Sequence, residues 1–433
     1  MLKRVIRIII LILVPFLLAL SSSLLLLPGL KPEKQMQIIS HLKSAENRFQ
    51  ENGTYRKRIW LDSDSWTFQS KLASQPLKMM VPSCWNSFPG LENYYGKAIY
   101  SLDFLVPDYF GSARPGGIAE FGPRIFLCFR GVSYQARVKL NSKNLGEHKG
   151  AYTQFEFEIT DSVLPEKHRA DKNIHLEVEV DNRLSMKTVP GKFEGWKHIG
   201  GIYREVYLEE RSEVFIKDAK IVAEPISSGG KLKVDLILDN ALGRSGEFLV
   251  RAVLEEKWKE IWLEKQVKIS GEKEFRVSLE QEISGVKSWS PEKPRLYPLA
   301  IKLFQQSKDE EQMIDQLDYR IGFRKIEARA ETLYLNGRIL KIQGISRHNF
   351  YPGYFQTIPP ELIESDLKKV KEMGANLIRL GHYPNHPYVL ELCDQIGLLV
   401  WEEIPAWGKL SPDYADPEVI REARSQLSEM IQR

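Results

Sequence analysis

The sequence predicts a multidomain protein in which two β-sandwiches precede part of a (β/α)8 barrel, with a transmembrane or signal segment in front of them. Three observations predict this β plus α/β fold class. Short runs with alternating apolar and polar residues fill the chain from about residue 60 to 325. Beyond residue 325, strand-like runs alternate with helix-like runs, as parallel sheets require. A continuous apolar stretch lies near the N-terminus.

A chain of 433 residues is too long for one ordinary core, so several domains are expected. Changes in pattern give these predicted boundaries: 1–29, signal anchor or signal peptide; 30–55, linker; 56–212, jelly-roll sandwich; 213–325, immunoglobulin-like sandwich; 326–433, partial barrel.

The N-terminal segment has the residue order of an export signal. Lys3, Arg4 and Arg7 precede Ile8–Leu27, a run of 20 residues without a charge. At about 1.5 Å per residue this run reaches roughly 30 Å, the thickness of a bilayer core. Cleaved signals have shorter apolar regions of about 7–15 residues, so we expect a membrane anchor with the domains outside the cytoplasm. A cleaved signal, giving a secreted or periplasmic protein, is the alternative.

Composition excludes some classes of function. The net charge of +4 is spread along the chain, so no nucleic-acid partner is expected. Aromatic residues make up 10%, which suits carbohydrate binding, although β-sandwich cores produce the same enrichment. Cys84, Cys128 and Cys393 form no disulfide framework. Cys128 and Cys393 are expected to be buried thiols, while a bond from Cys84 to either stays open.

Period-two runs separated by turns predict the two sandwiches. The first sandwich is predicted from five main runs, at 97–107, 124–141, 153–160, 173–182 and 204–210. The second, from Val214 to about Lys325, has room for roughly seven strands, which suits an immunoglobulin-like domain without its cysteine pair.

After the sandwiches, Asn336-Gly337 predicts a hairpin turn, and three βα units follow. Their predicted elements are strands at 341–346, 375–380 and 398–404 and helices at 360–374, 387–397 and 416–433. We expect the last helix to need further barrel elements beside it.

Polar side chains follow all three predicted strands, at the barrel end where active sites lie. A single such residue is more often a loop or capping residue, but three strand ends together favour a site. The candidate substrate-binding residues are Arg347, His348, Arg379, His382, Glu402, Glu403 and Trp407. Trp407 is either a stacking surface for a sugar ring or part of the core.

From about residue 60 to 433 the chain resembles glycoside hydrolase family 2, which contains β-galactosidases, β-glucuronidases and β-mannosidases. "FRGVSYQARVKLNSKNLGEHKGAYTQFEFEIT" is similar to the sugar-binding jelly roll of that family, and "IGGIYREVYL" to the end of that domain. "IGFRKIE", "LNGRILKIQGISRHNFYP" and "NLIRLGHYPNHPYVLELCDQIGLLVWEE" resemble the start of its barrel.

The resemblance implies roles for the strand-end residues. His348 and His382 match histidines that line the sugar subsite, Arg347 and Arg379 match supporting arginines, and Glu403 matches the acidic residue closing strand three.

Four positions depart from the family pattern. Gly381 replaces a usual Ser or Thr, Asn349 replaces a common acidic residue, and Glu194-Gly195 lies where many members have an Asp. Ile404–Trp407 offers no metal ligands of the magnesium-dependent type, so no metal or other cofactor is expected.

Family members hydrolyse terminal β-glycosidic bonds with retention, using two carboxylic acids about 5–5.5 Å apart. Glu402 and Glu403 are adjacent and should point to opposite faces of a strand, so they are not expected to form that pair. By the resemblance, the acid/base and nucleophilic glutamates are expected beyond residue 433, so no catalytic residue is assigned.

We therefore expect the 433-residue chain alone not to release nitrophenol from nitrophenyl β-glycosides, and turnover above an empty-vector control would contradict this. The expected partners are a β-glycoside oligosaccharide or glycoconjugate, the membrane, and a second copy or another chain supplying the rest of the barrel. The alternative function is that of a non-catalytic, membrane-anchored carbohydrate-binding protein. A third possibility, a structural adhesin that uses only the sandwiches, is weaker because it leaves the polar strand ends unexplained.

Overall fold

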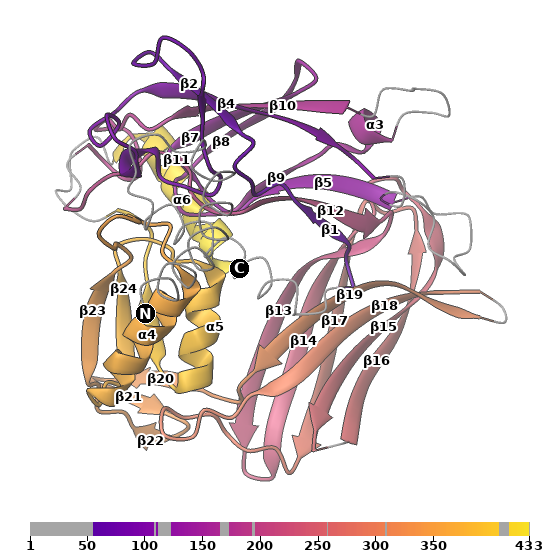
Figure 1. The fold of residues 1–433 in the computed structure, drawn as a ribbon. Coiled ribbons are helices and arrows are strands. Elements are labelled where there is room, and N and C mark those ends of the chain that lie inside the picture. The colour runs from indigo at the N-terminus through magenta and orange to yellow at the C-terminus, as the bar shows by residue number, and fades with distance from the viewer. Residues whose placement is uncertain are drawn as a thin grey trace, which may run out of the picture.

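The computed structural model describes residues 55–107, 110, 123–164, 173–192, 195–257, 259–307, 310–406 and 415–432. The predicted membrane or signal segment lies outside these residues and stays a prediction. Among the helices that are described, none combines the length and apolar character needed to cross a bilayer. The described part forms two β-sandwiches and a partial barrel, which confirms the predicted architecture in outline (Figure 1).

The first sandwich packs two antiparallel sheets against each other. One sheet contains, in spatial order, β1 (Arg58–Trp60), β12 (Val206–Ser212), β5 (Pro123–Phe129) and β9 (Phe155–Glu158). The other contains β3 (Leu77–Lys78), β2 (Thr67–Ser70), β4 (Lys97–Leu105), β10 (Asn173–Asp181), β7 (Gln135–Leu140) and β8 (Lys143–Lys149). Two short strands, β6 (Val132–Ser133) and β11 (Gly201–Ile202), pair separately, and two short helices, η1 (Trp85–Ser87) and α3 (Thr160–Val163), lie between strands.

The predicted run 124–141 is interrupted in the structure. It forms β5, β6 and β7, which belong to three different sheets, because the chain passes from one layer of the sandwich to the other near Gly131. The Gly131 carbonyl accepts hydrogen bonds from the amides of Tyr203 and Arg204 there. Alternation of apolar residues continues through this crossing because both layers face one core, so the pattern does not reveal the break.

The second sandwich has seven strands, as predicted. One sheet contains β13 (Phe215–Ile226), β14 (Gly229–Asp239) and β17 (Glu274–Ser284). The other contains β16 (Lys259–Ser270), β15 (Ser245–Glu256), β18 (Tyr297–Gln306) and β19 (Glu311–Ile321). In β14 every second side chain is buried, which is the period-two pattern of a strand with one face on the core.

The barrel part starts with a small antiparallel sheet of β20 (Ile326–Arg329), β21 (Thr332–Leu335) and β22 (Arg338–Ile339). Asn336 and Gly337 connect β21 and β22 with φ values of 53° and 76°. Positive φ at both turn positions is what a tight hairpin needs, and glycine and asparagine tolerate it best. The predicted turn is therefore confirmed.

Three parallel strands follow: β23 (Gly344–His348), β24 (Leu377–Gly381) and β25 (Leu399–Glu402). Three helices accompany them: α4 (Pro360–Glu372), α5 (Pro387–Ile396) and α6 (Pro417–Ile431). Each helix has proline at its first position, where the missing amide hydrogen costs no hydrogen bond. Strand β23 starts three residues later than predicted, but the parallel βα order is as expected.

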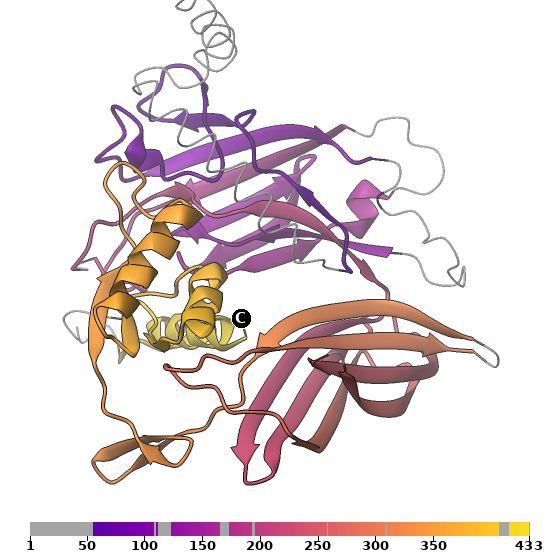
Figure 2. The same ribbon diagram turned by 60° about the horizontal axis from the view of Figure 1, so that its bottom comes forward.

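Helix α6 packs one face against the first sandwich (Figures 1 and 2). Its Ile420, Leu427 and Ile431 are exposed, so the expectation that it needs further barrel elements beside it stays a prediction. Gln426 Nε2 donates to the Val189 carbonyl at 2.6 Å, and the Val189 amide donates to Glu422 at 2.9 Å. Tyr134 also donates to Glu422, and Glu429 contacts His148 at 3.2 Å. The polar face of α6 thus finds its partners on the sandwich.

Most of the large aromatic residues serve the cores. Trp66, Trp85 and Tyr100 are buried in the first sandwich, which supports the core explanation of the aromatic enrichment. All three cysteines are described, buried and free, so the disulfide left open for Cys84 is not formed.

We expect the buried His198 to lower the free energy of unfolding in acid. Its side chain is buried, Nε2 donates to the Asn182 carbonyl at 2.9 Å, and burial lowers its pKa from 6.5 to about 4. Because the unfolded chain takes up a proton first as the pH falls, stability should be lost between about pH 6.5 and pH 4, by about 3 kcal/mol. Urea unfolding at several pH values should show a steeper loss for wild type than for His198→Gln, and parallel curves would contradict this.

Candidate functional site

Register places alternate residues of the three parallel strands on one face. Ser346 pairs with Arg379, which pairs with Trp401, and His348 pairs with Gly381 one layer further along. Paired residues of neighbouring strands point to the same side of a sheet. Strand geometry therefore brings serine, arginine and histidine side chains to the carboxyl ends of β23 and β24.

Glu403 is the centre of a compact polar group on this face. Its Oε1 lies 2.6 Å from Arg379 Nη2 and 2.7 Å from His382 Nδ1. Arg379 Nη1 also donates to Ser346 Oγ at 3.4 Å. A carboxylate held by a guanidinium and an imidazole is fixed in direction, so Arg379, His382 and Glu403 form a preorganised polar cluster.

His348 lies beside this cluster and is exposed. Its ring is 5.0 Å from the His382 ring, at 74° to it. Partial burial, followed by the neighbouring His382 and Arg379, lowers the pKa of His348. The imidazole is therefore neutral near pH 7, and such a ring offers one donor and one acceptor nitrogen to a ligand hydroxyl.

Two of the predicted residues point to the other side of the sheet. Arg347 Nη2 contacts Asp366 of α4 at 3.1 Å, and Glu402 accepts a hydrogen bond from the Asn385 amide at 2.6 Å. Alternation along a strand separates Arg347 from His348 and Glu402 from Glu403. The prediction that Arg347 and Glu402 bind substrate together with the histidines is therefore corrected. The prediction that Glu402 and Glu403 point to opposite faces agrees with the structure.

Three further positions were singled out from the sequence, and the structure describes one of them. Trp407 and Glu194 lie outside the described residues, and Asn349 is buried beside Arg347, which donates to its Oδ1 at 3.2 Å. Within the described ranges, no group of three or more His, Cys, Asp or Glu side chains is arranged to hold a metal ion.

Aromatic residues of the first sandwich reach this site, which the sequence did not reveal. The Trp196 ring lies 5.6 Å from the His382 ring, and its Nε1 donates to Tyr152 Oη at 3.1 Å. Tyr152 in turn stacks on Tyr383 with ring centroids 4.3 Å apart. Tyr152 lies in the quoted jelly-roll stretch and Trp196 follows Glu194-Gly195, but only their tertiary placement associates these two aromatic residues with the strand-end cluster.

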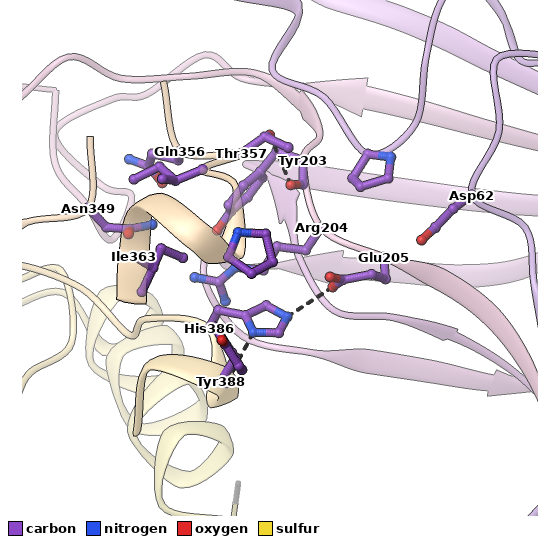
Figure 3. Close-up of a pocket in the computed structure, with 13 residues that line it drawn as sticks. Asp62, Tyr203, Arg204, Glu205, Asn349, Gln356, Thr357, Ile363, His386 and Tyr388 are labelled. Carbon is purple, nitrogen blue, oxygen red and sulfur yellow. Dashed lines mark hydrogen bonds and ion pairs between the residues drawn. The ribbon is translucent and has the colours of Figure 1, made fainter. Parts of the chain in front are cut away.

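A small cavity of about 40 Å³ with a mixed polar and apolar lining lies between the first sandwich and the barrel (Figure 3). At about 10–15 Å³ per molecule, it has room for a few waters. Arg204 and Glu205 line it from the sandwich, and Gln356 and His386 line it from the barrel. Both polar and apolar side chains of the two domains thus meet here.

Comparison with known proteins identifies the family. A sequence profile described as "Glycosyl hydrolases family 2" matches residues 214–324, and one described as "Glycosyl hydrolases family 2, TIM barrel domain" matches residues 326–426. The chain belongs to glycoside hydrolase family 2. The predicted family is therefore confirmed, and the strand-end cluster lies within the matched barrel region.

Similar family 2 proteins carry different names. A β-galactosidase of Thermoanaerobacter pseudethanolicus is 31% identical over 318 residues, covering 72% of this chain and 40% of that protein. A β-glucuronidase of Bacteroides fragilis is 27% identical over 405 residues, covering 87% and 54%. The chain thus spans about half or less of these relatives.

Solved structures show the same fold. A family 2 β-galacturonidase of Eisenbergiella tayi, bound to galacturonate, superposes with a TM-score of 0.72 at 29% identity. The match covers 87% of this chain and 63% of the other.

Proposed function

We propose that this chain supplies part of the substrate site of a retaining exo-β-glycosidase and that it binds the terminal sugar of a β-glycoside. The observation that carries the proposal is the cluster of Arg379, His382 and Glu403 at the carboxyl ends of parallel strands. Active sites of (β/α)8 barrels lie at that end. Membership of family 2 supplies the reaction class.

The described cluster suits sugar binding better than bond cleavage. Retaining hydrolysis needs two carboxylic acids about 5–5.5 Å apart on one side of the substrate. Glu402 and Glu403 point to opposite sides of the sheet, so they do not provide this pair. Charged and neutral groups around Glu403 instead offer donors and acceptors for sugar hydroxyls.

The sugar is proposed to be a β-linked galactose or hexuronic acid, because the named relatives are a galactosidase, a glucuronidase and a galacturonidase. Titration of the chain with methyl β-galactoside, methyl β-glucuronide and methyl β-galacturonide would test this. We expect saturable binding of at least one. Failure of all three to bind would contradict the proposal.

His382→Ala should weaken that binding by roughly 5–30-fold, since a ring that contacts Glu403 and faces His348 contributes about 1–2 kcal/mol through hydrogen bonds. Calorimetric titration would measure the change. His175→Ala is the matched control, because that exposed histidine pairs with Asp103 on the outer sheet of the first sandwich. Equal affinity of wild type and His382→Ala would contradict this prediction and indicate that the role of His382 is structural.

A further inference from the structure

The loop from His382 to His386 connects the candidate site to helix α5. His382 lies in the polar cluster at one end of the loop. At the other end His386 caps α5, and its Nδ1 accepts a hydrogen bond from the Tyr388 amide at 3.1 Å. The position of His382 therefore depends on what holds the four residues that follow it.

Arg204 of the first sandwich holds the middle of this loop. Its Nη2 donates to the Pro384 carbonyl at 2.9 Å, and its Nη1 donates to the Tyr152 carbonyl at 2.7 Å. The side chain is buried, with 4% exposed. A planar guanidinium with fixed donor directions is suited to bridging two carbonyls, which a lysine cannot reproduce.

Glu205, the next residue, holds the end of the loop (Figure 3). Its Oε2 lies 3.0 Å from His386 Nε2. Because His386 Nδ1 accepts from the Tyr388 amide, Nε2 carries the proton and donates to Glu205. Burial opposes ionisation of Glu205, but His386 and Arg130 keep its pKa below the usual range, so the acceptor is a carboxylate.

Neighbouring contacts act on the same loop. Tyr152, whose carbonyl is bound by Arg204, stacks on Tyr383, and Trp196 contacts both Tyr383 and His382. A separate polar junction between these domains lies at α6, where Glu422, Gln426 and Glu429 contact the sandwich. Sandwich side chains thus converge on the barrel loop that carries a site residue.

We propose that Arg204 and Glu205 are positioning residues, which hold the loop 382–386 so that His382 faces Glu403. The effect on ligand affinity rests on the proposed sugar-binding function, whereas the effect on His382 itself does not. The first sandwich then completes the barrel site from outside the barrel.

The size of the effect follows from the short contact between His382 Nδ1 and Glu403, 2.7 Å in length. A loop shift of about 1 Å breaks such a hydrogen bond, so the loss of sugar affinity should approach, and not exceed, the roughly 5–30-fold expected when the His382 ring is removed.

The test uses the full chain and four variants: Arg204→Met, Arg204→Lys, Glu205→Ala and Glu205→Gln. The first readout is the NMR signal of the His382 Cε1 proton, assigned by its loss in His382→Ala. The second is the affinity for the methyl glycoside that wild type binds. Glu429→Gln is the control, since Glu429 contacts His148 and Thr153 at the separate α6 junction.

We expect Arg204→Met and Glu205→Ala to shift the His382 signal and to weaken binding by up to the roughly 5–30-fold expected for His382→Ala. Glu205→Gln keeps an acceptor for His386 and should restore both readouts to near wild type, while Arg204→Lys should not. The control should change neither. If Arg204→Met does not fold, the contrast between Glu205→Ala and Glu205→Gln decides.

An unchanged His382 signal in Glu205→Ala and in every folded Arg204 variant would overturn the proposal. If wild type binds none of the sugars, the proposed function falls, yet the His382 signal still decides the positioning role. If wild type binds and the variants bind equally well, the positioning role falls and the proposed function stands.

Discussion

Replacing Asp315 with alanine should lower the free energy of unfolding of the sandwich pair by about 3–5 kcal/mol. Asp315 of β19 contacts Arg56 at two nitrogens, Nε at 3.0 Å and Nη2 at 2.8 Å, and accepts from the Ile216 amide at 2.8 Å. Both charged side chains are buried. Burial would lower the pKa of Arg56, but Asp315 and Glu209 raise it above its usual range.

The alanine variant leaves a buried guanidinium that keeps its contacts with Glu209 and the Ile216 carbonyl but loses its two hydrogen bonds to Asp315. Removing one partner of a buried pair costs more than the pair contributes, because the other charge stays without water. Urea unfolding followed by tryptophan fluorescence measures the loss. Glu280→Ala is the control, since Glu280 pairs with Lys231 on the exposed face of the second sandwich, where solvent screens the pair. Equal midpoints for the two variants would contradict the prediction.

Trp289→Ala should cost about 3–5 kcal/mol and should loosen the barrel from the second sandwich. Trp289 is fully buried and packs with Leu335 and Leu399 of the barrel part. Its Nε1 donates to the Asp394 carbonyl at 2.8 Å, and the Arg324 guanidinium lies 4.8 Å from its ring centroid. Alanine would leave a cavity at the junction and remove the hydrogen bond to α5.

Hydrogen exchange can locate this effect. We expect faster exchange in β23, β24 and β25 of Trp289→Ala, with the first sandwich protected as in wild type. Trp262→Ala is the matched control, because Trp262 of β16 is half exposed and packs under Arg251 at the surface. Unchanged protection of the barrel strands in Trp289→Ala would show that the junction does not depend on this residue.

The local sequence predicts individual elements well where one short-range rule decides them. Alternating side chains predict the strands of both sandwiches, since each strand has one face on a core. Asn336-Gly337 predicts its hairpin because few residues accept positive φ at two successive positions. Parallel βα order also predicts that Arg379, His382 and Glu403 meet, because all parallel strands end at one edge of the sheet.

Alternation predicts that adjacent strand residues point to opposite faces, but which of the two faces the cluster was decided by the structure. Arg347 and His348 were grouped by sequence, yet β23 sends Arg347 to α4 and His348 to the site. Similarly, the unbroken alternation of 124–141 concealed a passage between sheets, because both sheets share one core.

What the sequence by itself determined is therefore the set of elements, the family and the strand ends that carry the site. Only the tertiary structure decided which side chains complete it. Arg204 and Glu205 lie 180 and 181 residues before the loop positions they hold, Pro384 and His386. No local periodicity extends across such a separation. These contacts exist because the packing of two domains buries polar groups, and buried polar groups are stable only where a partner meets them.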